Sequence, residues 1–234
     1  MNESRERPSS GSPVVMSLRG RLIVSCQATA GDPTYGPHFM AAFARAAQIG
    51  GAAGIRASGP DDIRAIKAAT GLPVIGIQKA PGPDGRTLIT PSLELARPLV
   101  AAGADIVALD ATDRPRPGGL TAAQLIARLR AELRVPIMAD VEWPAEASAA
   151  VDAGADLVGP TLAVHHLPDY TPDIELVRTL ARLPVPVIAE GNFWTPEQVQ
   201  AAFDAGAWAV VIGSAITRPW LITQRFVAAT PARP

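Results

Sequence analysis

The fold class is decided by two short stretches near the C-terminal end, Pro186-Val187-Ile188-Ala189-Glu190-Gly191 and Ala209-Val210-Val211-Ile212-Gly213-Ser214. Each is an apolar run that stops abruptly at glycine and polar residues, and a segment of helical pattern separates the two. Strands of a parallel sheet are buried on both faces and read as continuous apolar runs, so their chemistry gathers where the run stops. The pattern therefore predicts two strands of a parallel sheet with functional groups at their carboxyl ends.

These two strand ends carry the groups that an anion needs. Backbone N–H groups are available at Gly191, Asn192, Gly213 and Ser214, and Arg218 follows four residues after the second end. Exposed N–H groups beside a guanidinium are typical of a phosphate site. We therefore expect these five residues to bind phosphate.

Apolar runs of the same kind recur along the whole chain and alternate with segments of helical spacing. The candidate strands span residues 22–26, 52–55, 74–77, 106–109, 137–139, 157–158, 187–189 and 210–212. Helical spacing of apolar residues occurs between them, for example over 63–66, 95–99, 125–129 and 176–180. The order strand, helix, strand, helix is therefore kept throughout.

An internal repeat selects one architecture from this pattern. A glycine-alanine pair precedes each even-numbered strand, at Gly51, Gly103, Gly154 and Gly206. Proline instead precedes the odd-numbered strands after the first, at positions 73, 136 and 186. The repeating unit is two strands and two helices, occurring four times, which favours a closed, parallel, eight-stranded (β/α)8 barrel over an open doubly wound sheet.

Several helix starts carry their own signals. Thr121 with Gln124, and Thr195 with Gln198, have the spacing of a capping box, and Pro219 has the place of a first helical residue.

Length and composition agree with one α/β domain. The 234 residues are 48% hydrophobic, enough for a large core. Residues 1–17 are rich in Ser, Pro, Arg and Glu, so we expect a disordered tail there and a catalytic barrel over residues 18–230.

Charge and cysteine content exclude several classes of partner. The formal net charge is -1 and the pI is about 6.3, which gives no basic field for nucleic acid and no polybasic membrane patch. No apolar stretch is long enough to span a bilayer, and the single Cys26 excludes an internal disulfide framework. We expect a cytoplasmic protein with a small-molecule partner.

In a (β/α)8 barrel the active site lies at the carboxyl ends of the strands, so polar residues there are the candidates. They are Gln27, Arg56, Lys79, Asp110, Asp140, Thr161 and Glu190, in addition to the five residues expected to bind phosphate. Each has an alternative structural role: Lys79 can be a solvated loop residue, and Glu190 can be a charge at a helix N-terminus. A desolvated ammonium among other cations exchanges protons near neutral pH, so we favour Lys79 as a general acid/base and Glu190 as a catalytic carboxylate.

The remaining charged candidates are assigned to the substrate. Arg56 directly follows an apolar run and is expected to bind substrate oxygen atoms, although a surface charge is the alternative. Asp140 is expected to orient Lys79 or a substrate hydroxyl. Asp110 lies in a more polar loop, and either aspartate can instead cap a neighbouring backbone N–H.

A metal site is the other possibility raised by the sequence. His165 and His166 with Asp169 are candidate ligands, but adjacent side chains diverge, and three histidines cannot supply several strand ends. We therefore predict no metal.

Seven motifs in the same order resemble the N-acetylmannosamine-6-phosphate 2-epimerase family. They are Leu22-Ile23-Val24-Ser25-Cys26-Gln27, Gly54-Ile55-Arg56-Ala57, Gly76-Ile77-Gln78-Lys79, Ala108-Leu109-Asp110-Ala111-Thr112, Met138-Ala139-Asp140, Ile188-Ala189-Glu190-Gly191 and Ala215-Ile216-Thr217-Arg218-Pro219. The resemblance implies a (β/α)8 barrel that interconverts N-acetylmannosamine 6-phosphate and N-acetylglucosamine 6-phosphate without a cofactor, usually in bacterial sialic acid breakdown.

The same resemblance implies roles for individual residues. Lys79 and Glu190 would be the proton-transfer pair, and Gln27, Arg56 and Asp140 would hold the sugar. Asp110 and Thr161 are added to the sugar-binding set because they end strands beside these residues. Arg218 and the glycine-rich turns would again bind the phosphate. A homodimer is the assembly considered for the chain.

Two segments depart from the family pattern. The family commonly continues its lysine with Arg, Asp and Tyr, whereas Lys79 is followed by Ala80-Pro81-Gly82-Pro83. The segment after the sixth strand, residues 162–167, also differs. Sugar preference can therefore have shifted while the reaction type is kept.

Two rival functions remain open at this point. One is another isomerase or epimerase among the phosphate-binding barrels, which share the phosphate site. The other is a non-catalytic phosphosugar-binding protein that has lost turnover, although phosphate binding alone requires neither Lys79 nor Glu190.

Overall fold

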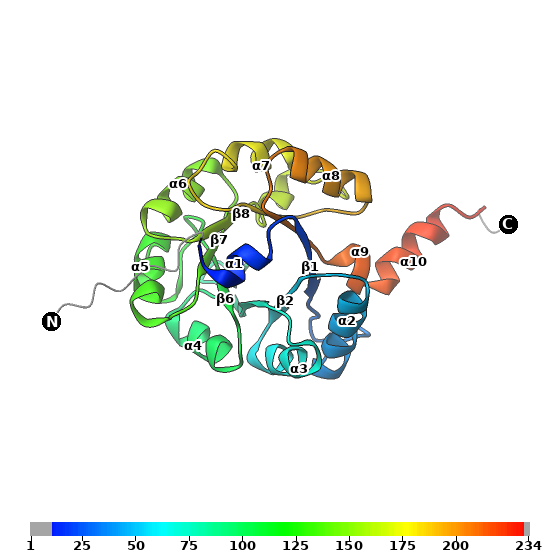
Figure 1. Cartoon of the computed structure of the whole chain (residues 1–234), viewed down its shortest axis with the longest axis horizontal. Coiled ribbons are helices and arrows are strands. Elements are labelled where there is room, and N and C mark those ends of the chain that lie inside the picture. Colours follow the sequence, from blue (N-terminus) through cyan, green and yellow to red (C-terminus); the bar gives the residue numbers. More distant parts are fainter. Residues whose placement is uncertain (1–10, 232–234) are drawn as a thin grey trace.

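Eight short parallel strands form the centre of the computed structural model, which describes residues 11–231 (Figure 1). They are β1 (Arg21–Cys26), β2 (Gly54–Ser58), β3 (Val74–Ile77), β6 (Ile106–Asp110), β7 (Ile137–Asp140), β8 (Leu157–Gly159), β9 (Ile188–Glu190) and β10 (Ala209–Ile212). Their order in the sheet is β8-β7-β6-β3-β2-β1-β10-β9, and a parallel bridge between Val158 and Val187 joins the two outer strands. The predicted (β/α)8 barrel is confirmed.

Helices surround this ring. They are α2 (Pro37–Ile49), α3 (Pro60–Thr70), α4 (Leu93–Ala101), α5 (Ala122–Glu132), α6 (Pro144–Asp152), α7 (Ile174–Leu180), α8 (Pro196–Asp204), α9 (Ser214–Thr217) and α10 (Pro219–Ala228), with short 3₁₀ turns η1 (Pro117–Gly119) and η2 (Ala163–His166). The capping boxes at Thr121 and Thr195 are both present, and Pro219 opens α10. No helix within residues 11–231 has the length and apolarity needed to cross a membrane.

The strands are buried on both faces because successive side chains point to opposite sides of a strand. One set fills the barrel interior, with Ile23, Ile75, Met138 and Ile188 among its members, and the other set packs against the surrounding helices. This explains why each strand reads as a continuous apolar run. It also leaves only the carboxyl ends of the strands for polar chemistry.

A short helix closes the opposite end of the barrel, where a disordered tail was expected. Helix α1 (Pro13–Ser17) lies across the centre of the ring in Figure 1. Val15 and the following Leu18 are buried against the barrel interior, and Trp208 Nε1 donates to the Val15 carbonyl at 2.8 Å. The predicted tail is therefore wrong for residues 13–17, because a brief apolar segment starting at a proline is enough to cover the barrel floor. Residues 1–10 of the expected tail lie outside the described residues.

A hairpin between β3 and α4 was not anticipated. Strands β4 (Lys79–Pro81) and β5 (Thr87–Ile89) pair in antiparallel fashion, with Lys79 opposite Ile89. Three-residue strands are too short to show a period of two in the sequence, although the proline and glycine residues between them indicate a turn. Strand β2 likewise begins two residues later than predicted.

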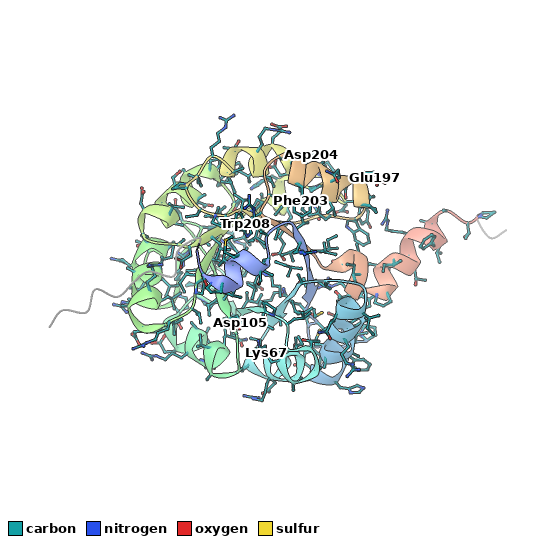
Figure 2. The ribbon with its side chains drawn as sticks, viewed as in Figure 1. Lys67, Asp105, Glu197, Phe203, Asp204 and Trp208 are labelled. Atoms are coloured by element: carbon teal, nitrogen blue, oxygen red, sulfur yellow. The ribbon has the colours of Figure 1, made fainter. Side chains whose placement is uncertain are left out.

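Charged pairs hold two of the repeats together at the barrel floor. Lys67 Nζ of α3 lies 2.9 Å from Asp105 Oδ2, and the two side chains point toward one another in Figure 2. Arg130 of α5 and Asp156 make the equivalent pair at 2.9 Å. In both cases the aspartate also accepts a hydrogen bond from the first N–H of an odd strand, β3 or β7. This accounts for the Gly-Ala-Asp form of the repeat at these two positions.

Candidate active site

A cavity of about 480 Å³ opens at the carboxyl ends of the strands. That size lies within the range of roughly 300–1,000 Å³ that is usual for small-molecule sites. Every residue predicted for the site lines the cavity except Asp110 and Asp140. The structure therefore brings together Gln27, Arg56, Lys79, Thr161, Glu190, Gly191, Asn192, Gly213, Ser214 and Arg218.

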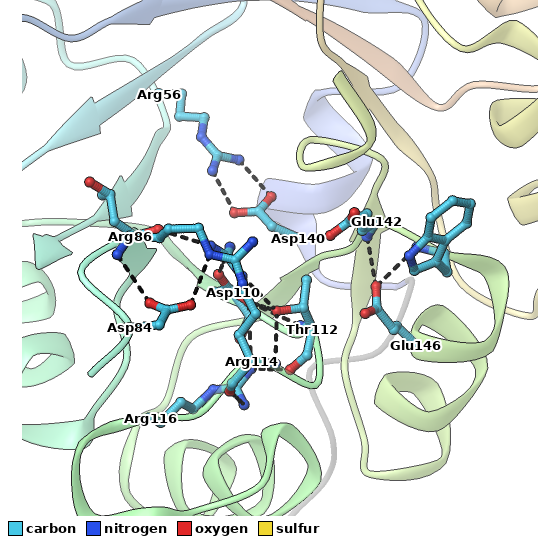
Figure 3. A network of polar contacts seen from close by, with 12 residues as sticks. Arg56, Asp84, Arg86, Asp110, Thr112, Arg114, Arg116, Asp140, Glu142 and Glu146 are labelled. Carbon is cyan, nitrogen blue, oxygen red and sulfur yellow. Dashed lines mark hydrogen bonds and ion pairs between the residues drawn. The ribbon is translucent and has the colours of Figure 1, made fainter. Parts of the chain in front are cut away.

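Arg56, in the middle of β2, is the buried centre of the charge network. Its Nη2 lies 2.6 Å from Asp140 Oδ2 and its Nη1 lies 3.1 Å from Asp140 Oδ1 (Figure 3). Nη1 also lies 2.9 Å from Glu190 Oε2. Arg56 is only 1% exposed, and its Nε has no hydrogen-bond partner among the described residues. The fork geometry fixes the guanidinium plane.

Asp140 lies behind Arg56 and does not line the cavity. Its carboxylate is fully buried, holds both guanidinium nitrogens and accepts a further hydrogen bond from Thr161 Oγ1 at 2.7 Å. The expectation that Asp140 orients Lys79 or a substrate hydroxyl is not what the geometry shows. Asp140 instead orients Arg56 and Thr161, which do line the cavity.

Glu190 ends β9 and faces the cavity with its side chain 14% exposed. Burial raises the pKa of Glu190 to about 7, against the opposing effect of the nearby Arg56 guanidinium. The negative charge of Asp140 acts in the same direction as burial. A carboxyl group with this pKa can both give and take a proton near neutral pH.

Lys79 is the first residue of β4 and enters the cavity from the hairpin. Burial lowers the pKa of Lys79, and the positive charges of Arg56 and Arg218 lower it further. Strand β3, which leads directly to Lys79, is separated from β9 by β2, β1 and β10 on one side and by β6, β7 and β8 on the other. Lys79 and Glu190 therefore come from opposite sides of the ring.

The turns after β9 and β10 form the remaining wall. Gly191 and Asn192 both have positive φ, 119° and 55°. A Cβ at Gly191 would lie 2.5 Å from Val164 Cγ1, so this turn requires glycine. Gly213 is the residue before α9 and Arg218 is the residue after it, and both line the cavity. The residues predicted to bind phosphate therefore lie together along one wall of the cavity.

Asp110 belongs to a separate cluster. Its carboxylate is fully buried and accepts hydrogen bonds from the Thr112 N–H and hydroxyl, while Arg114 and Arg116 supply positive charge. These partners explain why Asp110 does not reach the cavity, although it ends β6 as Asp140 ends β7.

Sequence reasoning missed several cavity residues. One of them is Ser25, which accepts a hydrogen bond from Gln27 Nε2 at 2.9 Å. The other end of the same amide, Gln27 Oε1, has no hydrogen-bond partner among the described residues. Thr87 and Ile89 line the cavity from β5. Only recognition of the hairpin in the Pro- and Gly-rich segment before Thr87 could have identified these last two residues.

Within the part of the chain that the structure describes, no three His, Cys, Asp or Glu side chains form a group that could hold a metal ion. His166 contacts the Glu142 carboxylate and stacks on Trp143. Cys26 is buried, and burial raises the pKa of its thiol to about 12. A thiol of that pKa is inert near neutral pH.

Comparisons with known proteins identify one family. Residues 40–232 match the model of the family described as "Putative N-acetylmannosamine-6-phosphate epimerase" (NanE). A protein of Caldanaerobacter subterraneus subsp. tengcongensis named "Putative N-acetylmannosamine-6-phosphate 2-epimerase" is 45% identical over 219 residues, 92% of each chain. A relative of the same name from Enterobacter sp. strain 638 is 45% identical over 224 residues, 92% of this chain and 94% of its own.

A solved structure supports the same family. The N-acetylmannosamine-6-phosphate 2-epimerase from Clostridium perfringens superimposes with a TM-score of 0.86 at 39% sequence identity. The match covers 92% of this chain and 95% of the other, so the similarity extends over the whole barrel.

Proposed function

The chain belongs to the N-acetylmannosamine-6-phosphate 2-epimerase family, and we propose on that basis that Lys79 and Glu190 invert carbon 2 of the phosphorylated sugar. The protein is an isomerase that interconverts N-acetylmannosamine 6-phosphate and N-acetylglucosamine 6-phosphate. The observation that carries the assignment of residues is the placement of Lys79 and Glu190 on opposite sides of one cavity.

The chemistry requires a proton to leave carbon 2 and another to arrive on the opposite face. In the open-chain sugar this C–H bond lies beside the aldehyde, so its electron pair can move onto the carbonyl oxygen as an enolate. One of the two residues takes the proton, and the other gives a proton to carbon 2 from the other side. Each such group typically contributes about 10²–10⁴-fold to the rate.

The two residues share one proton throughout. In one direction neutral Lys79 is the base and protonated Glu190 is the acid, and in the reverse direction Glu190 carboxylate is the base and Lys79 ammonium is the acid. Both directions therefore need the pair to carry a single proton. The lowered pKa of Lys79 and the raised pKa of Glu190 bring these states close in free energy.

Arg56 is the group we assign to the enolate oxygen. Asp140 and Glu190 fix its orientation before substrate binds, and Arg56 lines the cavity. A buried donor that is already oriented stabilises developing negative charge without reorganisation. Thr161 and Gln27 line the same cavity and are assigned to sugar oxygen atoms.

The phosphate group of the substrate is assigned to the wall formed by Gly191, Asn192, Gly213, Ser214 and Arg218. Backbone N–H groups and one guanidinium on this wall match a dianion. Holding the phosphate there would leave the rest of the sugar between Lys79 and Glu190. A non-catalytic phosphosugar-binding protein would need this wall but would not need the opposed acid and base.

The assay that tests this function compares phosphorylated with unphosphorylated N-acetylmannosamine. Purified protein should convert only the phosphorylated sugar, with product followed by NMR. Arg218→Ala should raise KM for it at least tenfold, because a charged hydrogen bond to phosphate is lost, whereas the exposed Arg128→Ala should leave KM unchanged. Equal turnover of both sugars, or an unchanged KM in Arg218→Ala, would contradict the assignment.

Two further properties belong to the same proposal. We place the reaction in the cytoplasm, since Cys26 is a free, buried thiol. We also propose a homodimer, supported by the exposed Phe226 and Val227 on α10, which projects from the barrel in Figure 1. Light scattering on the purified protein measures this assembly directly.

A further inference from the structure

One arginine outside the cavity links the end of β6 to the hairpin that carries Lys79. Arg114 Nη1 donates to the Thr87 carbonyl of β5 at 3.2 Å, and its Nε donates to Thr112 Oγ1 at 3.1 Å. Its Nη2 pairs with the Asp110 carboxylate, as Figure 3 shows. Arg114 is 13% exposed, and its contacts with Asp110 and Thr112 are partly buried, whereas its hydrogen bond to the Thr87 carbonyl is exposed.

The attachment point at the end of β6 is rigid. Asp110 and Thr112 are buried, and Thr112 donates both its N–H and its hydroxyl to Asp110. Arg116 Nη2 donates to the carbonyls of Asp110 and Thr112, and its Nη1 donates to the Arg114 carbonyl at 3.1 Å. These bonds fix the loop that presents Arg114.

The hairpin is attached at its base and through Leu88 and Ile89 of β5, which are buried, whereas Thr87 is exposed. At its base, Gln78 N donates to Thr90 Oγ1 at 3.0 Å, and Thr90 N donates to the Gln78 carbonyl at 2.7 Å. Thr90 is buried with φ 44°, an unfavourable value for a β-branched residue, so the base is held by its surroundings. An isolated two-stranded hairpin is marginally stable in water. The strand opposite Lys79 therefore depends on contacts with the barrel.

We propose that Arg114 is a positioning residue for epimerisation, which holds β5 against the barrel and thereby fixes Lys79 over the reacting carbon. The proposal rests on the proposed function, because it takes Lys79 as the acid/base. Lys79 pairs with Ile89 in the hairpin, and Thr87 and Ile89 line the cavity beside it. Releasing the Thr87 carbonyl removes the polar contact at the exposed end of β5, beyond the buried Leu88 and Ile89, and lets this end of the hairpin move and admit water to the lysine.

Hydration of Lys79 changes its pKa in a defined direction. Burial is the main cause of the lowered pKa of Lys79, so hydration of the ammonium raises that pKa toward its ordinary value. Because turnover needs one proton on the pair, the alkaline limb of the pH profile follows Lys79. This limb should move to higher pH when the hairpin loosens. A displacement of about 1 Å of a catalytic group can cost on the order of 10²-fold in rate.

The test uses Arg114→Ala and Arg114→Lys, with Arg86→Ala as the matched control. Arg86 lies in the same hairpin and pairs with Asp84 at the exposed tip, away from the cavity lining (Figure 3). Both Arg114 variants should lower kcat at least tenfold, leave KM for the phosphosugar within about threefold because the phosphate wall is untouched, and shift the alkaline limb upward. Lysine cannot reproduce the fork, so Arg114→Lys should keep the fold and still lose rate.

The outcomes distinguish failure of the positioning role of Arg114 from failure of the proposed function. If both Arg114 variants match Arg86→Ala in kcat and pH profile, the positioning role is wrong. The role is also wrong if kcat falls only in proportion to folded protein, measured by thermal unfolding, with an unmoved alkaline limb. Full turnover in Lys79→Ala would instead overturn the proposed function, whatever the Arg114 variants do.

Discussion

At the scale of single residues, the site is organised by which charges are satisfied before substrate arrives. Asp140 commits its carboxylate to Arg56, so Arg56 is oriented and Glu190 shares only one of its nitrogens. Removing one partner of a buried ion pair costs about 3–5 kcal/mol, so the pairing of Asp140 with Arg56 is stable. Glu190 is left as the group that can change its protonation state.

The first prediction concerns the acid limb of the pH profile. With the pKa of Glu190 raised to about 7, both Glu190 and Lys79 are protonated below that pH, and neither can act as base. We expect kcat/KM to fall as pH decreases through about 7. Glu190→Gln should lower kcat by about 10²–10⁴-fold and remove this limb.

The control in this experiment is the substrate itself. The second ionisation of a phosphate monoester lies near 6, and its contribution should persist in wild type and in Glu190→Gln. A limb near pH 7 that survives unchanged in the variant would show that Glu190 does not titrate in the reaction.

Residue roles could be predicted from the sequence only where the strand end alone decides them. Glu190 directly follows an apolar run and Lys79 follows one after Gln78, and both line the cavity. Asp110 and Asp140 are each the last residue of a strand, so the sequence pattern does not distinguish them. Their different surroundings come from the loops, because Arg114 and Arg116 cover Asp110. That arrangement depends on three-dimensional loop geometry.

At the scale of elements, the repeated helix-strand contacts hold the barrel in register. Asp105 accepts hydrogen bonds from Lys67 and from the first N–H of β3, and so ties α3, β3 and β6 together. Strand positions and helix caps were predictable because apolar period and capping residues are local signals. The β4–β5 hairpin and α1 were not, since each is shorter than the window over which a period can be read.

The element-scale prediction is that Asp105→Ala lowers the free energy of unfolding without changing kcat. The variant loses the hydrogen bond that the Val74 N–H of β3 donates to the charged carboxylate, worth about 1.5–3 kcal/mol, together with the Lys67 pair. Urea unfolding measures the change. Asp61→Ala, which removes an exposed pair with Arg64, is the matched control and should cost less than about 1 kcal/mol. Equal costs for the two variants would argue against a structural role for the repeat aspartate.

At the scale of the whole molecule, the closed ring explains why the two proton-transfer residues face one another. Only a closed eight-stranded order gives three strands on each side between β3 and β9. Helix α1 covers one end of the ring (Figure 1), and the cavity lies at the carboxyl ends of the strands, at the other end. The four-fold repeat was enough to predict closure, whereas the cover at the barrel floor became visible only in the structure.

The most direct test of the central claim is hydrogen exchange at carbon 2. N-acetylmannosamine 6-phosphate is incubated with the protein in deuterated water, and the carbon 2 hydrogen is followed by NMR. Because one residue takes the proton and the other returns one from solvent, the product should carry deuterium at carbon 2, and Lys79→Ala should form no product. Product that keeps its original hydrogen, or wild-type product formation by Lys79→Ala, would contradict the account.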